Sequence, residues 1–186
     1  HNTLHNLPYH EARMNRARAA LFGCTSPLKL SSQIHVPPAL DHSVYKCRVL
    51  YKKYIEHIAF IPYQIRSIQT LKLVYCDNIE YSHKYENRET INGLFTQRGS
   101  CDDILIVRKG CITDTSYSNV VFFDGKKWIT PSTPLLHGTQ RQKLLDEKII
   151  YEQKILVDDL SKFEYLKLTN ALLGFEGPLI PMSHVK

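Results

Sequence analysis

The stretch from Tyr81 to Leu145 decides the fold, because three short motifs mark it. The first, Tyr81-Ser82-His83-Lys84-Tyr85-Glu86-Asn87-Arg88, carries a lysine. The second, Gly110-Cys111-Ile112-Thr113-Asp114-Thr115-Ser116-Tyr117-Ser118-Asn119, carries an acid and an amide. The third, Leu135-Leu136-His137-Gly138-Thr139-Gln140-Arg141, places a glycine before a predicted helix. The three motifs therefore supply an amine, a carboxylate and a helix N-terminus in this order.

Each motif also has an ordinary interpretation. A lone lysine such as Lys84 is usually solvated surface, and Asp114 could be a turn or cap carboxylate. Asn119 could be a turn former, and glycines such as Gly138 precede many helices. Together the groups indicate a pyridoxal phosphate site. The amine would hold the aldehyde, the carboxylate would keep the ring nitrogen protonated, and the N–H groups of Gly138, Thr139 and Gln140 would bind the phosphate.

Lys84 and Asn119 have further roles in the predicted site, and Arg13 and Thr169 are added to it. A lysine that carries the cofactor must be partly desolvated so that its amine can be neutral, and Lys84 lies between two tyrosines just after a predicted strand. Asn119 would orient the Asp114 carboxylate. Arg13 and Thr169 are candidate phosphate ligands, although a surface arginine and a strand-end threonine would explain them equally when each is taken alone.

Composition indicates an ordinary globular protein. The chain has 186 residues, 43% of them apolar and 23% charged, which allows one domain or two small ones. The formal charge is +6 and the pI about 9.0. The basic residues are dispersed, so we expect no nucleic-acid role; the surplus charge suits an anionic substrate and a phosphorylated cofactor.

Cysteine usage and hydropathy indicate the compartment. The five cysteines are odd in number and form neither a CxxC pair nor a metal-ligand spacing, so we expect reduced thiols, no metal site and a cytoplasmic protein. No apolar run approaches the roughly 18 residues that span a bilayer. No signal peptide is visible, and we expect no membrane association.

The first third of the chain is predicted to form a small domain. Good helix formers between Pro8 and Leu21 end at Gly23. The segment 42–55 is ambiguous between helix and strand, and its β-formers favour a strand in its middle. An extended run follows from Ile58 to Tyr63. The polar residues 64–67 are a candidate linker, which sets the expected domains at 1–66 and 67–186.

The remainder alternates short strands with helices, which predicts a mixed α/β fold. A helix is expected from Asn87 to Arg98, a loop from Thr113 to Ser118, and a longer helix from Leu136 to Ile150. Asp124-Gly125 is a predicted hairpin turn. The expected strands are Leu71–Tyr75, Asp103–Val107, Cys111–Thr113, Val120–Phe123, Trp128–Thr130 and Tyr165–Leu168. A short helix is expected over Asp158–Lys162.

The order of these motifs resembles the class IV aminotransferase family. These are the fold-type IV pyridoxal phosphate enzymes, which include 4-amino-4-deoxychorismate lyase and the branched-chain and D-amino acid aminotransferases. The resemblance runs from His10 to Asn170. Five segments carry it: His10-x-x-Arg13, Lys84-x-x-Asn87-Arg88, Gly110 to Asn119, Thr130-Pro131 with Leu135-Leu136-x-Gly138 and Arg141, and Leu168-Thr169-Asn170-Ala171.

The sequence departs from the family pattern at two points. Asp114 stands where the family has glutamate, so its carboxylate is one methylene shorter. The chain also has only nine residues ahead of the His-x-x-Arg motif, where the family has a further strand. The expected N-terminal domain therefore lacks its first strand, and substrate residues from that region are not assigned.

The resemblance implies a two-domain enzyme with a small N-terminal and a larger C-terminal α/β domain, a homodimer that acts on a small amino substrate. Lys84 would be the attachment and proton-transfer residue. Arg13, Asp114, Asn119, Gly138, Thr139, Gln140 and Thr169 would bind pyridoxal 5'-phosphate. The Lys-x-x-Asn-Arg motif favours the lyase, which forms pyruvate and 4-aminobenzoate. Transamination of branched-chain or D-amino acids is the alternative, and a non-catalytic binding protein is the third hypothesis.

Overall fold

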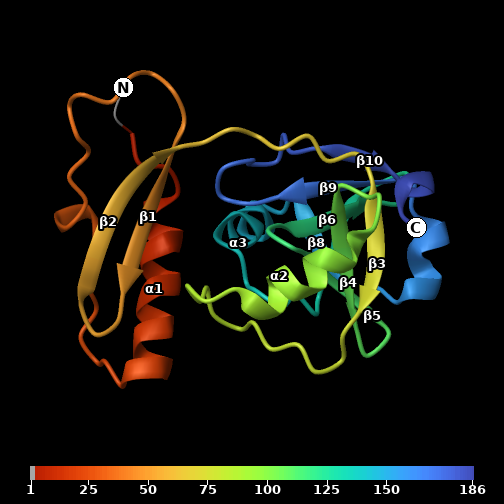
Figure 1. Cartoon of the computed structure of the whole chain (residues 1–186), viewed down its shortest axis with the longest axis horizontal. Coiled ribbons are helices and arrows are strands. Elements are labelled where there is room, and N and C mark those ends of the chain that lie inside the picture. The colour runs from red at the N-terminus through yellow and green to blue at the C-terminus, as the bar shows by residue number, and fades with distance from the viewer. Residues whose placement is uncertain (1–2) are drawn as a thin grey trace. The chain divides into compact units, whose positions relative to one another are not determined.

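The computed structural model describes residues 3–186 (Figure 1). The chain divides after Ile65 into two compact units, and the second begins at Arg66. Both units combine helices with antiparallel strands, and the second also contains parallel strand pairs. The mixed α/β class expected from the sequence is confirmed. No helix within residues 3–186 is long and apolar enough to cross a membrane.

The first unit contains one long helix and a two-stranded sheet. Helix α1 (Leu7–Phe22) ends at Gly23, whose positive φ of 65° and N–H bond to Ala19 O form a C-cap that glycine adopts without strain. Strands β1 (Tyr45–Tyr51) and β2 (Ile55–Pro62) pair antiparallel. A short 3-10 helix, Leu30–Ser32, supplies Leu30 to the small core. The predicted helix and the strand in the middle of 42–55 are therefore confirmed.

The second unit is built on one eight-stranded sheet in the order β10-β9-β6-β5-β4-β3, with β7 pairing with β6 and β8 with β7. Only the pairs β3–β4 and β7–β8 are parallel. The strands are β3 (Leu71–Tyr75), β4 (Asp103–Arg108), β5 (Cys111–Thr115), β6 (Asn119–Phe123), β7 (Trp128–Pro131), β8 (Ile150–Gln153), β9 (Tyr165–Thr169) and β10 (Leu179–Pro181).

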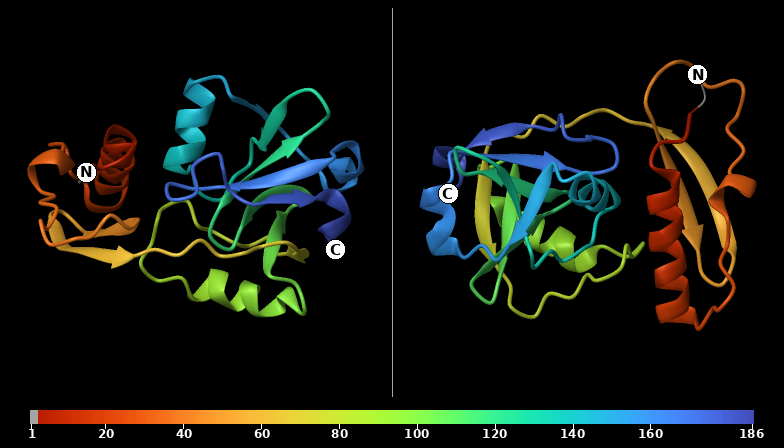
Figure 2. Two further views of the ribbon diagram at one scale, coloured as in Figure 1. Left: turned by 90° about the horizontal axis from the view of Figure 1, so that it is seen from above. Right: turned by 180° about the vertical axis from the view of Figure 1, so that it is seen from behind.

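Strand β4 shows how the sequence builds two cores around this sheet. Residues Ile104 to Val107 are fully buried, and alternate side chains point to opposite faces. Ile104 and Ile106 pack with Ile91 and Leu94 of α2 (Glu89–Phe95), whereas Leu105 and Val107 join the larger cluster on the other face. In the left view of Figure 2, α2 and α3 (Thr139–Asp146) lie on opposite sides of the strands.

Several boundaries differ from those predicted. The expected helix from Asn87 to Arg98 is α2 followed by a 3-10 turn, Thr96–Arg98. The expected helix from Leu136 to Ile150 is shorter, because Lys148 has a positive φ of 56° and Ile150 starts β8, which pairs with β7. Strand β5 reaches Thr115, so Asp114 lies in a strand and not in a loop. Strands β8 and β10 were not predicted.

Two more 3-10 helices lie near the C-terminus. The first, Val157–Lys162, covers the segment where a short helix over Asp158–Lys162 was expected. The second, Met182–His184, follows β10. The last residues return to β3, where Leu73 N donates to Lys186 O and Lys186 N to Leu71 O. The C-terminal segment thus completes the β3 edge of the sheet.

Candidate functional site

The centre of the candidate site is a three-way contact between β5, β6 and the segment that leads into α3. Asp114 and Asn119 are directly paired across β5 and β6. Asn119 Nδ2 donates to Asp114 Oδ1 at 2.7 Å and to Leu136 O at 2.8 Å. Leu136 N donates to Asp114 Oδ2 at 2.9 Å. Each carboxylate oxygen therefore accepts one bond and keeps lone-pair capacity for another.

The environment of Asp114 shifts its titration. Burial raises the pKa of the Asp114 carboxyl from 3.8 to about 6, because removal from water penalises the charged form. The Leu136 N–H, the Asn119 amide and the charge of Arg141 oppose that shift. The carboxyl is consequently ionised above about pH 6. A buried carboxylate of this kind can hold a ring-nitrogen proton.

Gly138 connects this network to the start of α3. A Cβ added at Gly138 would lie 2.0 Å from Asn119 Oδ1, so only glycine fits beside the amide. Gly138 is also the N-cap of α3, and no side chain caps this helix. Thr139 and Gln140, which begin the helix, are buried. An uncapped helix start supplies N–H groups and a positive dipole end for an anion.

Arg141 fixes the first turn of α3 to the sheet. Its side chain is only 1% exposed. Arg141 Nη2 donates to Pro131 O at 2.8 Å and forms an ion pair with Glu152, and Nε donates to Thr130 Oγ1 at 3.3 Å. Because a buried guanidinium needs such partners, these bonds tie the helix start to β7 and β8.

Thr169 lies in the strand next to Asn119. The two residues pair across β6 and β9. Thr169 is fully buried, and its Oγ1 donates to Gly174 O at 2.7 Å. This bond uses the only hydroxyl proton, so the hydroxyl would have to turn before it could donate to a phosphate. The predicted phosphate contact of Thr169 stays a prediction.

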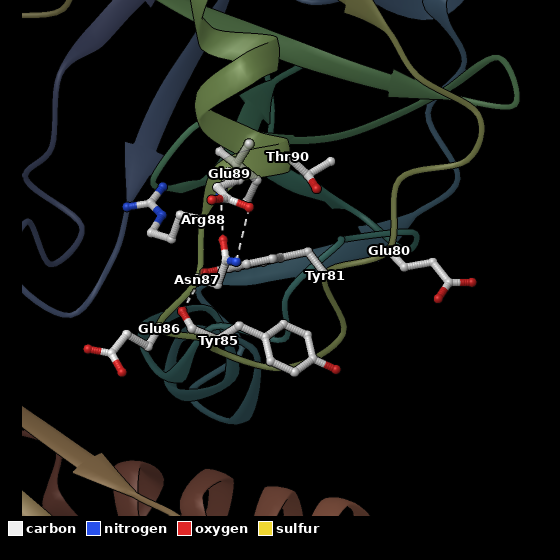
Figure 3. A pocket seen from close by; sticks show the side chains of 9 residues that line it. Glu80, Tyr81, Tyr85, Glu86, Asn87, Arg88, Glu89 and Thr90 are labelled. Atoms are coloured by element: carbon white, nitrogen blue, oxygen red, sulfur yellow. Dashed lines mark hydrogen bonds between the residues drawn. The ribbon is translucent and has the colours of Figure 1, made fainter.

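Lys84 lies in the loop between β3 and α2. The side chain is exposed, which differs from the partial burial expected of an attachment lysine. Next to it, the rings of Tyr81 and Tyr85 form an edge-on pair with centroids 5.9 Å apart. A cavity of about 290 Å³ adjoins this loop (Figure 3) and is lined by Glu80, Tyr81, Tyr85, Glu86, Asn87, Arg88, Glu89, Thr90 and Ile91.

The end of the lysine motif has a structural explanation. Asn87 Oδ1 accepts a 2.8 Å bond from Glu89 N, which satisfies one N–H at the start of α2. Arg88 Nη2 donates to Ser116 O in the turn between β5 and β6. The Lys84 loop and the Asp114 strand are therefore joined through Arg88. The sequence analysis named Arg88 only as part of the lysine motif and gave it no role of its own. Its positive charge was the one feature of the sequence that could have indicated such a role.

Arg13 belongs to the first unit, where it lies on α1. Burial, followed by the charge of Arg13, lowers the pKa of His10 to about 4. His10 and Arg13 are thus electrostatic neighbours, as their positions one helical turn apart suggest. The contact between Arg13 and a cofactor phosphate stays a prediction.

The second unit offers three features that fit a phosphopyridoxal group. Asp114 provides a buried carboxylate with accepting capacity, α3 provides an uncapped N-terminus, and Lys84 provides an amine. The first two are rigidly connected, since Leu136 bonds to Asp114 and Gly138 packs on Asn119. The Asp114 carboxylate and the start of α3 can therefore hold the ring nitrogen and the phosphate of one cofactor molecule at a fixed distance from each other.

Comparison with known proteins gives matches in sequence and in fold. The family model of amino-transferase class IV matches residues 85–176. An uncharacterized protein of Haemophilus influenzae is 41% identical over 173 residues, which are 92% of each chain. A crystal structure of a candidate 4-amino-4-deoxychorismate lyase from Haemophilus somnus is 34% identical, with 91% of this chain and 90% of that chain covered and a TM-score of 0.84.

A more distant structure shares the fold. It is the pyridoxal phosphate-bound form of a hypothetical aminotransferase from Mycobacterium tuberculosis, 17% identical, with a TM-score of 0.69. The match covers 89% of this chain and 72% of that one. At this identity the likeness is one of fold alone.

Proposed function

The chain belongs to the class IV aminotransferase family, and we propose that it is a pyridoxal phosphate-dependent 4-amino-4-deoxychorismate lyase that forms pyruvate and 4-aminobenzoate. One observation carries the cofactor assignment: the buried Asp114 carboxylate is bonded to Leu136, two residues before the glycine that starts α3. The Lys84-x-x-Asn87-Arg88 motif and the 34% identical Haemophilus somnus structure favour the lyase.

The proposed roles follow from the contacts. Lys84 would hold the cofactor aldehyde, and Asp114, oriented by Asn119, would keep the ring nitrogen protonated. The start of α3, with Gly138, Thr139 and Gln140, receives the phosphate, and Arg13 and Thr169 are its further proposed ligands. When bound, the protonated ring supplies an electron sink for the carbanion formed on the substrate.

Proton transfer is assigned to Lys84. With cofactor and substrate bound, the Lys84 amine would remove a proton from the substrate ring. The ring C–O bond then breaks, enolpyruvate leaves and takes up a proton to become pyruvate, and the aromatic product keeps the amino group. Atoms balance without an added reagent, because the substrate divides into the two products. We further propose that the enzyme acts as a homodimer.

Transamination is the competing proposal, because the same lysine, carboxylate and helix start would serve it. In that reaction an amino acid would be converted to its keto acid, with the cofactor as the carrier of the amino group. Structures that share the fold include one described as a hypothetical aminotransferase. Branched-chain and D-amino acids are the amino donors to test.

The deciding experiment compares the two reactions on the same purified protein loaded with pyridoxal phosphate. Release of 4-aminobenzoate is followed by its fluorescence with aminodeoxychorismate as the substrate, and keto acid formation is followed for a panel of branched-chain and D-amino acids. Lys84→Arg serves as the inactive control. Turnover of aminodeoxychorismate that Lys84→Arg lacks supports the lyase. Faster turnover of an amino acid and keto acid pair would replace the lyase with a transaminase, and a colourless inert protein would exclude both.

A further inference from the structure

A second, smaller cavity in the second unit lies between α2 and the turn that joins β5 to β6. Its volume is about 140 Å³, and it is lined by Arg66, Arg88, Asn92, Phe95, Ser116 and Tyr117. Pockets that enclose whole small ligands usually measure roughly 300–1,000 Å³. A cavity of this size accommodates one functional group of a ligand and a few carbon atoms.

Arg88 presents unused hydrogen-bonding capacity here. Its Nη2 donates to Ser116 O, whereas its Nε is buried and has no hydrogen-bond partner within residues 3–186. A guanidinium is always charged and carries five N–H donors. A buried N–H without a partner destabilises the protein, and the same arginine lines this cavity.

Arg66 supplies the second positive charge. Its guanidinium carbon lies 5.0 Å from the centroid of the Tyr117 ring and 5.4 Å from that of Phe95. Stacking on two rings holds a guanidinium in place while its edge remains available to acceptors. The cavity therefore combines two arginines with two aromatic rings.

Two carboxyl groups act on Arg66: Asp102, which accepts hydrogen bonds from Gln69 and Thr70, and Asp103, whose Oδ2 has no hydrogen-bond partner among the described residues. Asp102 Oδ2 accepts 2.9 Å bonds from Gln69 N, Thr70 N and Thr70 Oγ1. Asp103 is fully buried, and burial raises the pKa of its carboxyl, against which the Ser116 side chain and Arg66 act. Neither forms an ion pair of 4.0 Å or less with Arg66 among the described residues.

We propose that this cavity is a subsite for a carboxylate of the amino substrate, with Arg88 and Arg66 as its ligands. The identity of the substrate in this inference rests on the proposed function. The negative charge of the bound group is inferred from the two arginines of the cavity. Arg88 also lines the larger cavity beside the Lys84 loop, and Ser116 lies two residues beyond Asp114. Arg88 follows Lys84 by four residues in the chain, so the proposed subsite adjoins the segment that carries the proposed attachment lysine.

The test uses the full chain without added cofactor, so it does not depend on the lyase assignment. Benzoate and its neutral analogue benzamide are titrated calorimetrically into the parent, Arg88→Met and Arg66→Met. The matched control is Arg98→Met. Arg98 also stacks on Phe95, at 4.1 Å, but does not line the cavity. Loss of one charge-assisted contact should weaken benzoate binding about tenfold to a hundredfold.

The expected result is that the parent and Arg98→Met bind benzoate alike, both cavity variants bind it at least tenfold more weakly, and benzamide binds weakly throughout. Equal loss in Arg98→Met, equal binding of benzamide, or no benzoate binding by the parent would overturn the subsite. Tighter competition by inorganic phosphate would reassign it to a phosphate. Arg88→Gln, which removes the charge but keeps an amide donor for Ser116 O, replaces Arg88→Met if circular dichroism shows that the latter does not fold.

A second readout separates this inference from the proposed function. With pyridoxal phosphate added, Arg88→Met should show the same visible absorbance of lysine-bound cofactor as the parent, while its KM for a carboxylate-bearing amino substrate rises at least tenfold. Loss of that absorbance in Arg88→Met alone would make Arg88 a cofactor ligand and contradict the subsite. Absence of the absorbance in the parent would instead contradict the proposed function.

Discussion

Asn119 Nδ2 lies 2.7 Å from Asp114 Oδ1 and donates a hydrogen bond to it across the paired strands β5 and β6. The same nitrogen donates to Leu136 O, so one amide orients the carboxylate and holds the segment leading into α3. Asn119 Oδ1 lies against Gly138 on its other side. Asn119 is therefore the residue through which the carboxylate and the helix start keep a fixed geometry.

Asn119→Ala should disturb both the Asp114 carboxylate and the segment that leads into α3. The change leaves Asp114 Oδ1 and Leu136 O without the donor they share, and each lost buried partner costs about 1–3 kcal/mol. We expect a lower free energy of unfolding in urea and weaker pyridoxal phosphate binding. The exposed Asn78→Ala is the control and should change neither quantity. Unchanged cofactor affinity in a folded Asn119→Ala protein would show that the amide does not position the site.

Gly138→Ala tests the close packing at the start of α3. The new methyl group would lie 2.0 Å from Asn119 Oδ1, so the amide or the helix start must move. Overpacking of this kind costs about 1–3 kcal/mol, and cofactor affinity should fall as well. Gly93→Ala in α2 is the matched control, because apart from the neighbouring residues and the backbone of its own helix no atom lies within 4 Å of its added Cβ. In Gly93→Ala the free energy of unfolding should rise by up to about 1 kcal/mol, because alanine favours the helix more than glycine does. Equal urea midpoints for the two variants would contradict the predicted clash.

The raised pKa of Asp114 predicts a pH-dependent contribution to stability. The pKa of its carboxyl is about 6 in the folded protein and 3.8 when the group is exposed to water, as in the unfolded chain. Between these values the folded protein keeps a proton that the unfolded chain releases. The contribution is thus fully present below pH 3.8 and lost as the pH rises through 6.

The matched variant is Asp114→Asn, which cannot titrate at this position. Without cofactor, the unfolding free energy of the parent relative to Asp114→Asn should fall by about 2 kcal/mol between about pH 4.5 and 7.5. Asp103 is present in both proteins, so its titration cancels in the difference. A difference that does not vary with pH would mean that Asp114 titrates normally.

Asp114 also shows how far the sequence could predict the site. The acid and the amide were recognisable at positions 114 and 119, but their segment was expected to be a loop. The polar run from Thr113 to Ser118 favours a loop in isolation, whereas pairing of β5 with both β4 and β6 extends the strand to Thr115. Tertiary pairing overrides local propensity here.

Other features were beyond sequence reasoning for related reasons. The Leu136 N–H that donates to Asp114 is a backbone group, and no pattern of residue types predicts such a bond. The predicted helix to Ile150 was too long because strand β8 pairs in parallel with the distant β7. The apolar run Asp103–Val107 was predictable because a strand buried on both faces reads as continuous apolar sequence.

Arg13→Ala tests the predicted phosphate contact of α1. Loss of one arginine–phosphate bond should weaken pyridoxal phosphate binding about tenfold to a hundredfold. Thr169→Ala should cost less, because it removes a neutral group whose proton already bonds to Gly174 O. Arg16→Ala, an exposed arginine on the same helix, is the control. Fluorescence titration with the cofactor gives the affinities. Parent-like affinity in Arg13→Ala would make Arg13 a structural residue of α1.

The central claim is that Lys84 carries pyridoxal phosphate, and borohydride reduction followed by peptide mapping tests it most directly. The purified protein with cofactor should show the visible absorbance of a lysine-bound aldehyde, and reduction should fix the cofactor permanently. We predict that mass spectrometry finds the label on the peptide containing Lys84 and that Lys84→Arg gives none. A label on Lys72 or Lys109, or a parent protein that takes up no label, would contradict the account.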